Sequence, residues 1–546
     1  MKQRRIEIVL SIISWIVLCL AIFSYYQQRA IHPAMYDSDT LVYSSLFEDV
    51  IRDGNSWTSW YLPVAPNYFP DMLLFFFINF LGVNFAVSVL IQTIINQFLT
   101  IAGMHLIAVS ISRKNFWITS MFLVSAGTIV ILIASLFGNR ASFFEPYLVR
   151  LQGHSGSFIV SLFCLGILLQ NLNSERLRNY AFIFFLSFFT VLSDGIFVVN
   201  FVLPAMGAMT FAYIVAAVST RTFIRTNIVL VMSVVLGFGT HKIITFNSIA
   251  RQYIQPSGER ISKAFGAFLT DVSSLFARND IFLWATMLWF AIAVVLILAF
   301  ISTAARNVRF AGYLDCHGIS SRNLQFFVVT SILMIGSCIV APIASGTYVN
   351  ISCLRYLFSG AAISVFGGMM AVGIIGGTLF PRVGRALAFG ILVFNLVGTT
   401  KVAARTKGGQ PPWTYVPPVV QCVDRYADDY DLGSGISHYW NGKLATLYSK
   451  EGVRILQVDR NLNPFLTNNS TEWYLATTRG ELPVPGYNFV VTGEKWGFRI
   501  DGQVVVKKYG DPLFRLRCGR NEVYVYGEDF DLKIRKGFHD FLESRQ

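Results

Sequence analysis

Residues 6–23 read IEIVLSIISWIVLCLAIF, an apolar run that follows the basic start Met1–Arg5. The run is longer than a signal-peptide core and has no small-x-small cleavage site, so it predicts a retained membrane span. Ten further apolar runs predict further helices; they lie near 84–111, 116–137, 156–170, 180–192, 195–218, 227–246, 281–302, 326–344, 359–380 and 386–400. The sequence therefore predicts a polytopic α-helical membrane protein with about 11 spans. Several runs are short, and the pair around Ser193–Asp194 could instead form a re-entrant or tilted hairpin.

Charged residues are distributed unevenly along the 546-residue chain, which carries a formal net charge of +13. Residues 402–546 hold 36 charged side chains, about a quarter, which is usual for a soluble domain. The first 401 residues hold 39, about a tenth, which is a membrane composition. This difference argues against a soluble enzyme and divides the chain into a membrane domain, 1–401, and a soluble domain, 402–546.

The soluble domain opens with the stiff segment PPWTYVPP at 411–418. Two stretches, 418–426 and 437–449, are typical of helices. Six short alternating runs predict strands and hairpins: VRILQVD, NFVVTG, WGFRIDG, QVVVKKYG, LFRLRCG and NEVYVYG. We therefore expect an α+β domain with a β-rich core.

Basic residues in short loops predict the orientation of the membrane domain. Alternate loops carry a consistent cytoplasmic set: Lys2, Arg4, Arg5, Arg113, Lys114, Arg176, Arg178, Arg221, Arg225, Arg306, Arg309, Arg322, Arg382 and Arg385. The N-terminus is therefore predicted to be cytoplasmic. The loops 24–69, 138–155, 247–280 and 345–358 and the soluble domain are placed on the extracytoplasmic face.

Several classes of function are disfavoured. The longest cytoplasmic loop, near 303–325, is too short for a nucleotide-binding domain, and the chain has no Gly-rich phosphate loop. ATP-driven transport and soluble nucleotide-sugar chemistry are therefore not expected. The seven cysteines show no metal-ligand spacing. Cys422 and Cys518 fall in the outer domain, where they would be either a disulfide or two free thiols.

The first outer loop, 24–69, is acidic in a region otherwise poor in charge. Residues 32–71 read HPAMYDSDTLVYSSLFEDVIRDGNSWTSWYLPVAPNYFPD and contain six carboxylates, Asp37, Asp39, Glu48, Asp49, Asp53 and Asp71. For Glu48, Asp49 and Asp53 we favour solvated loop charges. Asp37 and Asp39 lie in an apolar context near the membrane, where a carboxylate can act as a base or bind a metal.

Residues 69–84, FPDMLLFFFINFLGVN, follow this loop. The Pro-opened apolar stretch 70–82 is too short to cross a membrane, so it predicts a juxtamembrane helix along the outer interface. An N-terminal span, an acidic first outer loop, this helix ending in Leu-Gly and a return span closing on Arg-Lys together resemble the GT-C superfamily of membrane glycosyltransferases. The chain is also similar to uncharacterised bacterial membrane proteins with Ser-Asp and Tyr-Phe-Pro-Asp in this loop, here Ser38–Asp39 and Tyr68–Asp71.

The resemblance implies that a first-loop carboxylate deprotonates or orients the acceptor hydroxyl. The matching positions are Asp39 as base and Asp37 as a supporting residue, with a divalent metal such as Mg²⁺ or Mn²⁺ as an optional cofactor on this pair. Asp39→Asn would then nearly abolish turnover, because general-base catalysis contributes roughly 10²–10⁴-fold.

A leaving phosphate carried by a lipid requires cations at the outer surface. The candidates are Arg140, Arg150, His154, Lys242 and Arg355, and Arg355 with Tyr356 is similar to an Arg-Tyr pair of several GT-C members. Snorkelling at the interface is the alternative for Arg355. Asp194 and Asp71 are further site candidates, and Asp194 could instead cap the following helix.

Two other segments have a functional and a structural interpretation. The apolar spacing within 251–280 predicts an amphipathic helix lying on the membrane, which either anchors the protein or covers a lipid-donor groove. In the outer domain Tyr439, Trp440 and Trp473 could recognise the acceptor, with structural capping as the alternative.

The leading functional hypothesis is therefore a GT-C-type glycosyltransferase in a bacterial inner (plasma) membrane. Its donor would be a polyprenyl-phosphate-linked sugar, and its acceptor an envelope glycan, lipid or protein. Membrane lipids are further expected partners, and no nucleic acid is expected. The alternatives are a transporter or flippase of lipid-linked envelope precursors and a non-catalytic envelope assembly protein.

Overall fold

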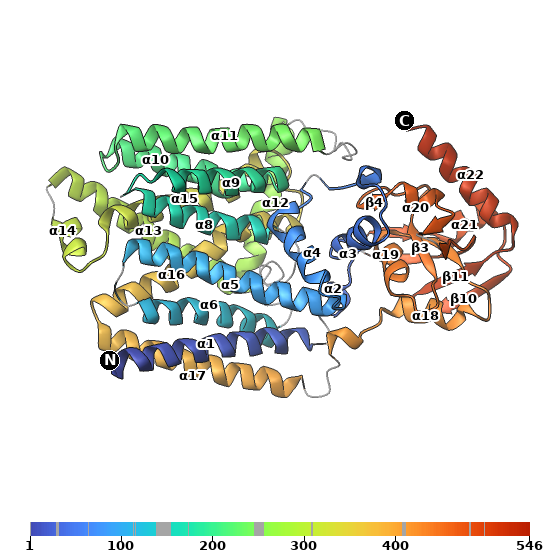
Figure 1. The fold of residues 1–546 in the computed structure, drawn as a ribbon, viewed down its shortest axis with the longest axis horizontal. Helices are drawn as coiled ribbons and strands as arrows, with labels where there is room; N and C mark the ends of the chain where they lie inside the picture. The colour runs from blue at the N-terminus through green and yellow to red at the C-terminus, as the bar shows by residue number, and fades with distance from the viewer. Residues whose placement is uncertain are drawn as a thin grey trace.

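A computed structural model gives the arrangement of the chain. It describes residues 2–28, 32–63, 65–112, 114, 116–137, 154–172, 174–244, 256–306, 309–406, 411–479, 482–495 and 497–545. These residues form a bundle of roughly parallel helices and a smaller domain at one end of the bundle (Figure 1).

Eight helices in the described ranges are long and apolar enough to cross a membrane, judged by length and composition. They are α1 (Lys2–Tyr26), α5 (Phe85–Ile111), α6 (Phe116–Phe137), α11 (Thr220–Ile244), α13 (Ile281–Arg306), α15 (Ser321–Ala344), α16 (Phe358–Thr378) and α17 (Pro381–Arg405). Large apolar side chains such as Ile228 and Val235 of α11 remain exposed. Water would penalise these surfaces, whereas lipid would cover them.

Each of the eleven predicted runs coincides with a helix, but three of the helices are short. These are α8 (Ser155–Asn171), α9 (Leu177–Ser193) and the continuous pair η5 (Val198–Val202) and α10 (Leu203–Ile214). The count of about 11 spans therefore stays a prediction.

The predicted helix at 70–82 is present at the loop's end as η3 (Tyr68–Met72) followed by α4 (Leu73–Asn79). The rest of the first loop forms α2 (His32–Met35), α3 (Leu41–Leu46), η1 (Phe47–Arg52), η2 (Trp57–Ser59) and the short strand β1 (Trp60–Tyr61). These elements lie between the bundle and the C-terminal domain (Figure 1).

The N-terminus of the chain and the C-terminal domain lie at opposite ends of the bundle. The N-terminus lies at the end of the bundle remote from the C-terminal domain, which is also the end where α14 (Arg309–Cys316) lies (Figure 1). This arrangement agrees with the prediction that the N-terminus and the soluble domain lie on opposite sides of a membrane. Which side is cytoplasmic stays a prediction.

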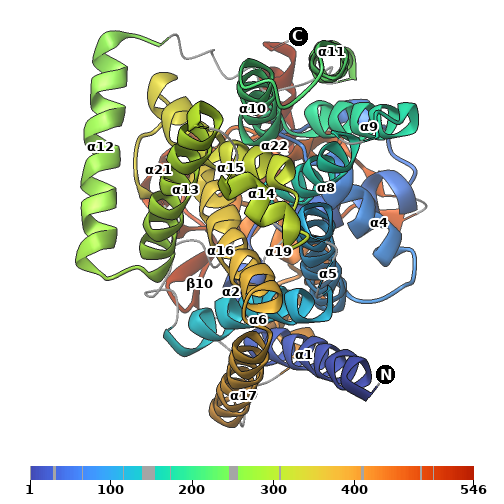
Figure 2. The same cartoon turned by 90° about the vertical axis from the view of Figure 1, so that its left-hand side faces the viewer.

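A helix does form in the region predicted to be amphipathic: α12 (Gly258–Ala277). It begins at Ser257, whose hydroxyl accepts the Arg260 N–H, and its apolar side chains Ile261, Phe265 and Leu269 are exposed. Figure 2 shows α12 running across the direction of the long helices at the edge of the bundle. A helix with that orientation and an exposed apolar face suits a membrane interface.

The C-terminal domain contains a five-stranded mixed sheet with strand order β10-β11-β7-β2-β3. The strands are β2 (Ser434–Ser437), β3 (Arg454–Gln457), β7 (Tyr487–Val491), β10 (Phe514–Cys518) and β11 (Asn521–Val525). Three short ribbons add β4 (Asn469–Ser470), β5 (Thr478–Arg479), β6 (Leu482–Pro483), β8 (Gly493–Lys495) and β9 (Phe498–Ile500). The helical elements are η7 (Pro412–Thr414), α18 (Pro418–Ala427), α19 (Tyr439–Tyr448), α20 (Glu472–Leu475), α21 (Gly502–Tyr509) and α22 (Asp529–Glu543).

Two features of this domain differ from the sequence prediction. The run QVVVKKYG, predicted as a strand, is helix α21, because the Asp501 side chain accepts the Gln503 N–H and caps the helix start. Gly510, with φ of 91°, ends it. In addition, β2 pairs in parallel with both β3 and β7, so the centre of the sheet is not built from hairpins.

Cys422 of α18 and Cys518 of β10 form a disulfide, so the bonded alternative is confirmed. The bond ties the first helix of the domain to the edge strand of the sheet. Structural disulfides persist in oxidising compartments. This bond is therefore consistent with an extracytoplasmic location for the domain.

Replacing both Cys422 and Cys518 with alanine is expected to lower the free energy of unfolding of the domain by about 2–4 kcal/mol, because the bond closes a long loop. Thermal unfolding of the full-length protein in detergent measures the effect. Cys316→Ala, which changes an exposed free cysteine, is the control. An unchanged melting temperature for the double variant would show that the bond contributes nothing to stability.

Candidate functional site

Asp71 lies at the start of the juxtamembrane helix and is 3% exposed. Its Oδ1 atom accepts no hydrogen bond from the residues that the structure describes. Its Oδ2 atom lies against Gly156, where an added Cβ would come within 2.7 Å of the Asp71 Cγ atom. A glycine is therefore required at position 156 for this carboxylate to occupy its place.

The backbone around Asp71 is held from two sides. The Ser193 hydroxyl accepts the Phe69 N–H at 2.7 Å, and the Ser193 carbonyl accepts the Asn67 N–H at 3.1 Å. The Gln92 amide donates to the Asp71 carbonyl at 3.0 Å. These bonds bring Asp71 to the end of α9, where Asp194 follows.

Asp194 and His154 form a contact pair beside Asp71. The Asp194 Oδ2 atom lies 2.6 Å from His154 Nδ1, and the Asp194 side chain is 3% exposed. The Asp194 Oδ1 atom accepts the Ile196 N–H at 3.2 Å. The capping interpretation of Asp194 is therefore confirmed, because one oxygen accepts the N–H of the following turn. The other oxygen contacts the histidine, and a role of Asp194 in a functional site stays a prediction.

Arg355 and Tyr356 complete the group. The His154 and Tyr356 rings have centroids 6.0 Å apart. The Arg355 guanidinium lies 5.2 Å from the centre of the Tyr356 ring and donates to its hydroxyl at 3.3 Å. We call Asp71, His154, Asp194, Arg355 and Tyr356 the domain-side cluster, because they lie at the end of the bundle that faces the C-terminal domain.

Burial raises the pKa of Asp71 to about 7, and the charge of Asp194 adds to the rise. The Gly156 N–H and His154 act in the opposite direction. Two neighbouring carboxylates in a site closed to water do not both ionise readily. Asp71 can therefore change its protonation state near neutral pH, as a general base must.

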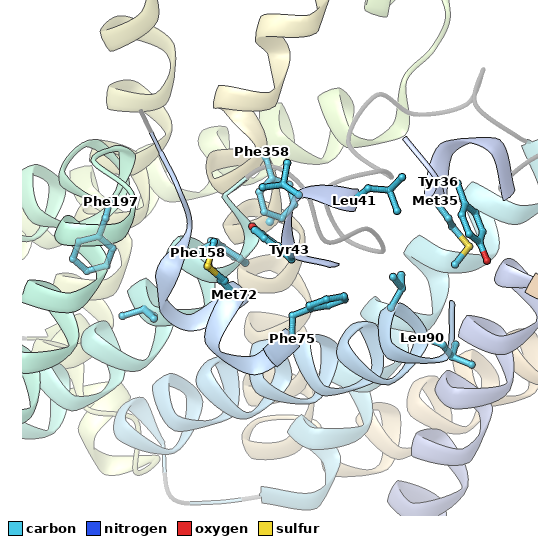
Figure 3. Close-up of a cluster of buried hydrophobic side chains, with 14 of the residues drawn as sticks. Met35, Tyr36, Leu41, Tyr43, Met72, Phe75, Leu90, Phe158, Phe197 and Phe358 are labelled. Carbon is cyan, nitrogen blue, oxygen red and sulfur yellow. The ribbon is translucent and has the colours of Figure 1, made fainter. Parts of the chain in front are cut away.

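Tyr43 of α3 connects this cluster to the rest of the first loop. Figure 3 shows its side chain among Met72, Phe158 and Phe358. Burial raises the pKa of Tyr43 well above its ordinary value, and the charges of Asp71, Asp194 and Asp39 contribute to the rise. Asp39, near the start of the first loop, and Asp71, at its end, therefore both raise the pKa of the same Tyr43 hydroxyl.

Asp37 and Asp39 have separate partners. The Asp37 Oδ1 atom accepts the Thr40 N–H at 2.8 Å and so caps a turn. Asp39 is exposed and accepts a hydrogen bond from the Tyr439 hydroxyl of the C-terminal domain. Within the described ranges no group of three or more His, Cys, Asp or Glu side chains is arranged to hold a metal ion. This arrangement does not fit one ion shared by the two carboxylates, so no step is assigned to a metal.

The contact between Asp39 and Tyr439 belongs to a continuous junction between the first loop and the C-terminal domain. The Asn468 amide donates to the Tyr439 hydroxyl at 2.9 Å, and the Ser38 hydroxyl donates to the Tyr439 carbonyl at 2.6 Å. Strand β1 pairs with β4, aligning Trp60 with Ser470. We call this contact the loop–domain junction. It docks at the carboxyl end of the parallel strand β2, an edge where α/β sheets commonly bind ligands.

Lys443 is a buried cation at the same junction. Its ammonium group donates to Gln457 at 3.0 Å and lies 5.3 Å from the centre of the Tyr439 ring. Burial lowers the pKa of Lys443 to about 7, and the charge of Asp39 opposes that change. Asp39 therefore supports the positive charge of Lys443 as well as the hydroxyl of Tyr439.

Tyr439→Phe is expected to weaken the loop–domain junction by about 1–3 kcal/mol, because it removes the hydroxyl that bridges Asp39 and Asn468. Faster limited proteolysis between the two parts of the chain, at 407–416, would report the loss. Tyr430→Phe, which changes a half-buried tyrosine elsewhere in the domain, is the control. Equal cleavage rates for wild type and Tyr439→Phe would contradict the bridging role.

The remaining candidates lie elsewhere. Lys242 is exposed near the end of α11, where the neighbouring His241 Nδ1 atom lies 2.8 Å from the Leu192 carbonyl. Arg140 and Arg150 are outside the described residues. In the outer domain Trp440 is half-buried, while Trp473 is buried and donates to Asp49 at 2.5 Å. The prediction that Asp49 is a solvated loop charge is therefore wrong, because Asp49 is buried and also accepts the Trp60 indole N–H.

Sequence reasoning did not find Tyr43, Gly156 or Lys443. Gly156 follows His154 closely, and that proximity was the one available signal. Tyr43 and Lys443 have no local motif, and their roles depend on partners far away in the chain.

Comparison with known proteins does not identify a family for this chain. No protein-family model matches the chain, and no curated protein matches it either.

Proposed function

We propose that this chain is a membrane glycosyltransferase of the GT-C type, which transfers a sugar from a polyprenyl-phosphate carrier to a hydroxyl group of a cell-envelope acceptor. Its location would be the bacterial inner membrane, with the N-terminus cytoplasmic and the C-terminal domain outside. The eight long apolar helices and the domain at one end of the bundle support such a location.

The observation that carries the proposal is the domain-side cluster. Asp71 presents a buried carboxylate oxygen with no hydrogen-bond donor among the described residues. Arg355 contacts Tyr356, whose ring lies 6.0 Å from that of His154. A carboxylate that takes up a proton near neutral pH suits the activation of an acceptor hydroxyl. A guanidinium group suits a leaving phosphate, because its fork of donors matches phosphate oxygens.

In the proposed reaction the acceptor oxygen attacks the anomeric carbon and forms the new glycosidic bond. The bond from that carbon to the phosphate oxygen breaks, and its electron pair leaves with polyprenyl phosphate. The proton of the acceptor hydroxyl passes to Asp71, whose neutral form Asp194 and burial favour. Arg355 stabilises the phosphate that departs.

This proposal gives Asp71 the role of base that the family resemblance alone assigned to Asp39. Asp39 is exposed and bonded to Tyr439, so we assign it the role of positioning the C-terminal domain. Comparing Asp39→Asn with Tyr439→Phe separates the two assignments. A base at Asp39 requires turnover to collapse in Asp39→Asn alone, whereas a positioning residue gives similar, modest losses in both variants.

The test is to incubate the purified full-length protein with polyprenyl-phosphate sugars and an envelope extract, and to measure released polyprenyl phosphate. Release that depends on Asp71 and on the extract supports a transferase. Movement of the intact lipid-linked sugar across vesicles, without release, would instead identify a flippase. If neither release nor movement is observed, envelope assembly is the role that remains for the chain.

A further inference from the structure

A cavity lies at the end of the bundle remote from the C-terminal domain, between the starts of α1, α6 and α17. Its volume is about 600 Å³, within the ~300–1,000 Å³ range of small-molecule sites. Of the nine described residues that line it, seven are apolar, and the other two are Glu7 and Arg385. Figure 2 looks onto this end of the bundle, where the three helices lie together at its lower edge.

The floor of the cavity belongs to a small core of its own. Ile118 of α6 and Ala388 of α17 are buried there, and Leu10 of α1 packs against them. The Ser11 hydroxyl donates to the Trp117 carbonyl at 3.2 Å and ties α1 to the start of α6. The walls therefore keep their positions, and the cavity is a feature of the packed bundle.

The rim of the cavity is open toward the outside of the bundle. Ile6 and Phe389, which line it, are 54% and 56% exposed. Both belong to helices that are long and apolar enough to cross a membrane. In a bilayer an acyl chain would fill this space, because an empty cavity forfeits the packing contacts of its walls.

Arginine side chains gather at this end of the cavity. Arg385 lines it, and Arg382 lies one turn earlier on the same face of α17. On α1, Arg4 and Arg5 directly precede the lining residue Ile6. Within the described ranges, none of these four guanidinium groups forms a hydrogen bond or an ion pair. They are therefore available to an anion that comes from outside the chain.

Glu7 carries the one negative charge among the described residues that line the cavity. The first turns of α1 and α17 contain no acidic residue. Four arginines against one glutamate leave a local net charge of +3. The site therefore favours a ligand with net negative charge over a zwitterionic one.

We propose that this cavity binds an anionic phospholipid such as phosphatidylglycerol. One acyl chain occupies the apolar space between the three helices, and the phosphate lies beside Arg382 and Arg385. A guanidinium group suits this place, because its fork of N–H donors matches two phosphate oxygens. Basic pockets between membrane helices bind anionic headgroups in this manner.

This lipid is distinct from the sugar donor of the proposed function. Helix α1 has 25 residues and is about 37 Å long at 1.5 Å per residue. The cavity lies at one end of this helix, and the domain-side cluster lies at the opposite end of the bundle. The lipid site therefore does not depend on the transferase proposal, and either can fail alone.

Native mass spectrometry of the delipidated full-length protein in detergent measures the binding. Dioleoylphosphatidylglycerol and dioleoylphosphatidylcholine are added in separate titrations, because they share their acyl chains and differ in the headgroup. We expect the first phosphatidylglycerol molecule to bind at least tenfold more tightly than the first phosphatidylcholine molecule. Equal affinities for the two lipids would overturn the proposal.

Variants locate the site. Replacing Arg382 and Arg385 together with glutamine removes cations, whereas Ala386→Trp fills the cavity from an exposed position and keeps the charge. Each change is expected to weaken binding of phosphatidylglycerol about tenfold or more. The matched control replaces Arg221 and Arg225 with glutamine, a cationic pair at the start of α11 that does not line the cavity. This control should leave the affinity unchanged.

Two outcomes would contradict the assignment. If the double arginine variant and its control weaken binding equally, the arginines act only as general interfacial charges. Wild-type affinity in Ala386→Trp would place the acyl chain elsewhere. Because residue 386 is exposed, Ala386→Trp decides the question even if the double arginine variant fails to fold.

Discussion

Asp71→Asn is expected to lower the release of polyprenyl phosphate by roughly 10²–10⁴-fold, because asparagine cannot take the proton of the acceptor hydroxyl. The amide keeps the shape of the carboxylate, so the loss should appear in kcat rather than in the amount of folded protein. Single-turnover measurement of release gives the rate. Glu48→Gln is the control, since Glu48 forms a surface ion pair with Arg52 that contributes little.

The pH dependence of wild-type protein gives an independent check on Asp71. A base must be ionised, so turnover should fall as the pH falls through about 7, the pKa to which burial and Asp194 raise this carboxyl. The stability changes in the opposite sense. A folded pKa above the ordinary value of about 4 favours the neutral form, so that contribution to folding is full at low pH and is lost as pH rises through about 7.

Asp71→Asn should therefore reduce the fall in unfolding temperature between pH 4 and pH 7 as well as remove the activity. Two results would contradict the assignment. One is wild-type turnover in Asp71→Asn, and the other is an activity profile of wild type without a decline below pH 7.

Arg355→Gln is the second substitution with a large expected effect. Removing one cationic group that faces a departing phosphate costs about 2.7–4 kcal/mol of transition-state stabilisation, or roughly 10²–10³-fold in rate. The neutral side chain also loses the contact with the Tyr356 ring. The measurement is kcat/KM for the polyprenyl-phosphate sugar.

Arg278→Gln is the matched control, because Arg278 is an exposed arginine just after α12. Arg355→Lys should recover part of the activity, since lysine keeps the charge but not the planar fork. If Arg355→Gln and Arg278→Gln behave alike, Arg355 is an interfacial side chain without a role in phosphate binding.

Much of the helical architecture was predictable, because a membrane span needs a long apolar run and such runs are visible in any one segment. The positions of α1, α5 and α6 and of the juxtamembrane helix followed from composition alone. The disulfide was left open by the sequence, since two cysteines separated by 96 positions carry no information about their distance in space. The segment of helix α21 was predicted as a strand because its centre is rich in β-branched residues, which favour strands. The capping residue Asp501, which favours a helix start, was not taken into account.

The sequence predicted most residues of the candidate site, but it did not predict that they lie together. Asp194, His154, Arg355 and Tyr356 were each noticed as polar groups at the ends of apolar runs, where an ionisable side chain is costly and marks a function. Their convergence on Asp71 depends on how α8, α9 and η6 (Ile351–Leu357) pack, and on the hydrogen bonds from Ser193. Asp39, favoured from the first-loop resemblance, was placed by the fold against Tyr439 instead.

The sequence by itself determined which segments are apolar helices, where the soluble domain begins and which residue types are available for chemistry. Those properties are local, because hydrophobicity and charge are read one segment at a time. The tertiary structure decided which of these residues meet. Asp71 gains its environment from Gly156 and Asp194, which are far away in the chain, and Asp39 meets Tyr439 because the first loop docks on the C-terminal domain. Desolvation and proximity are properties of the packed molecule, and they set the chemistry of a carboxylate.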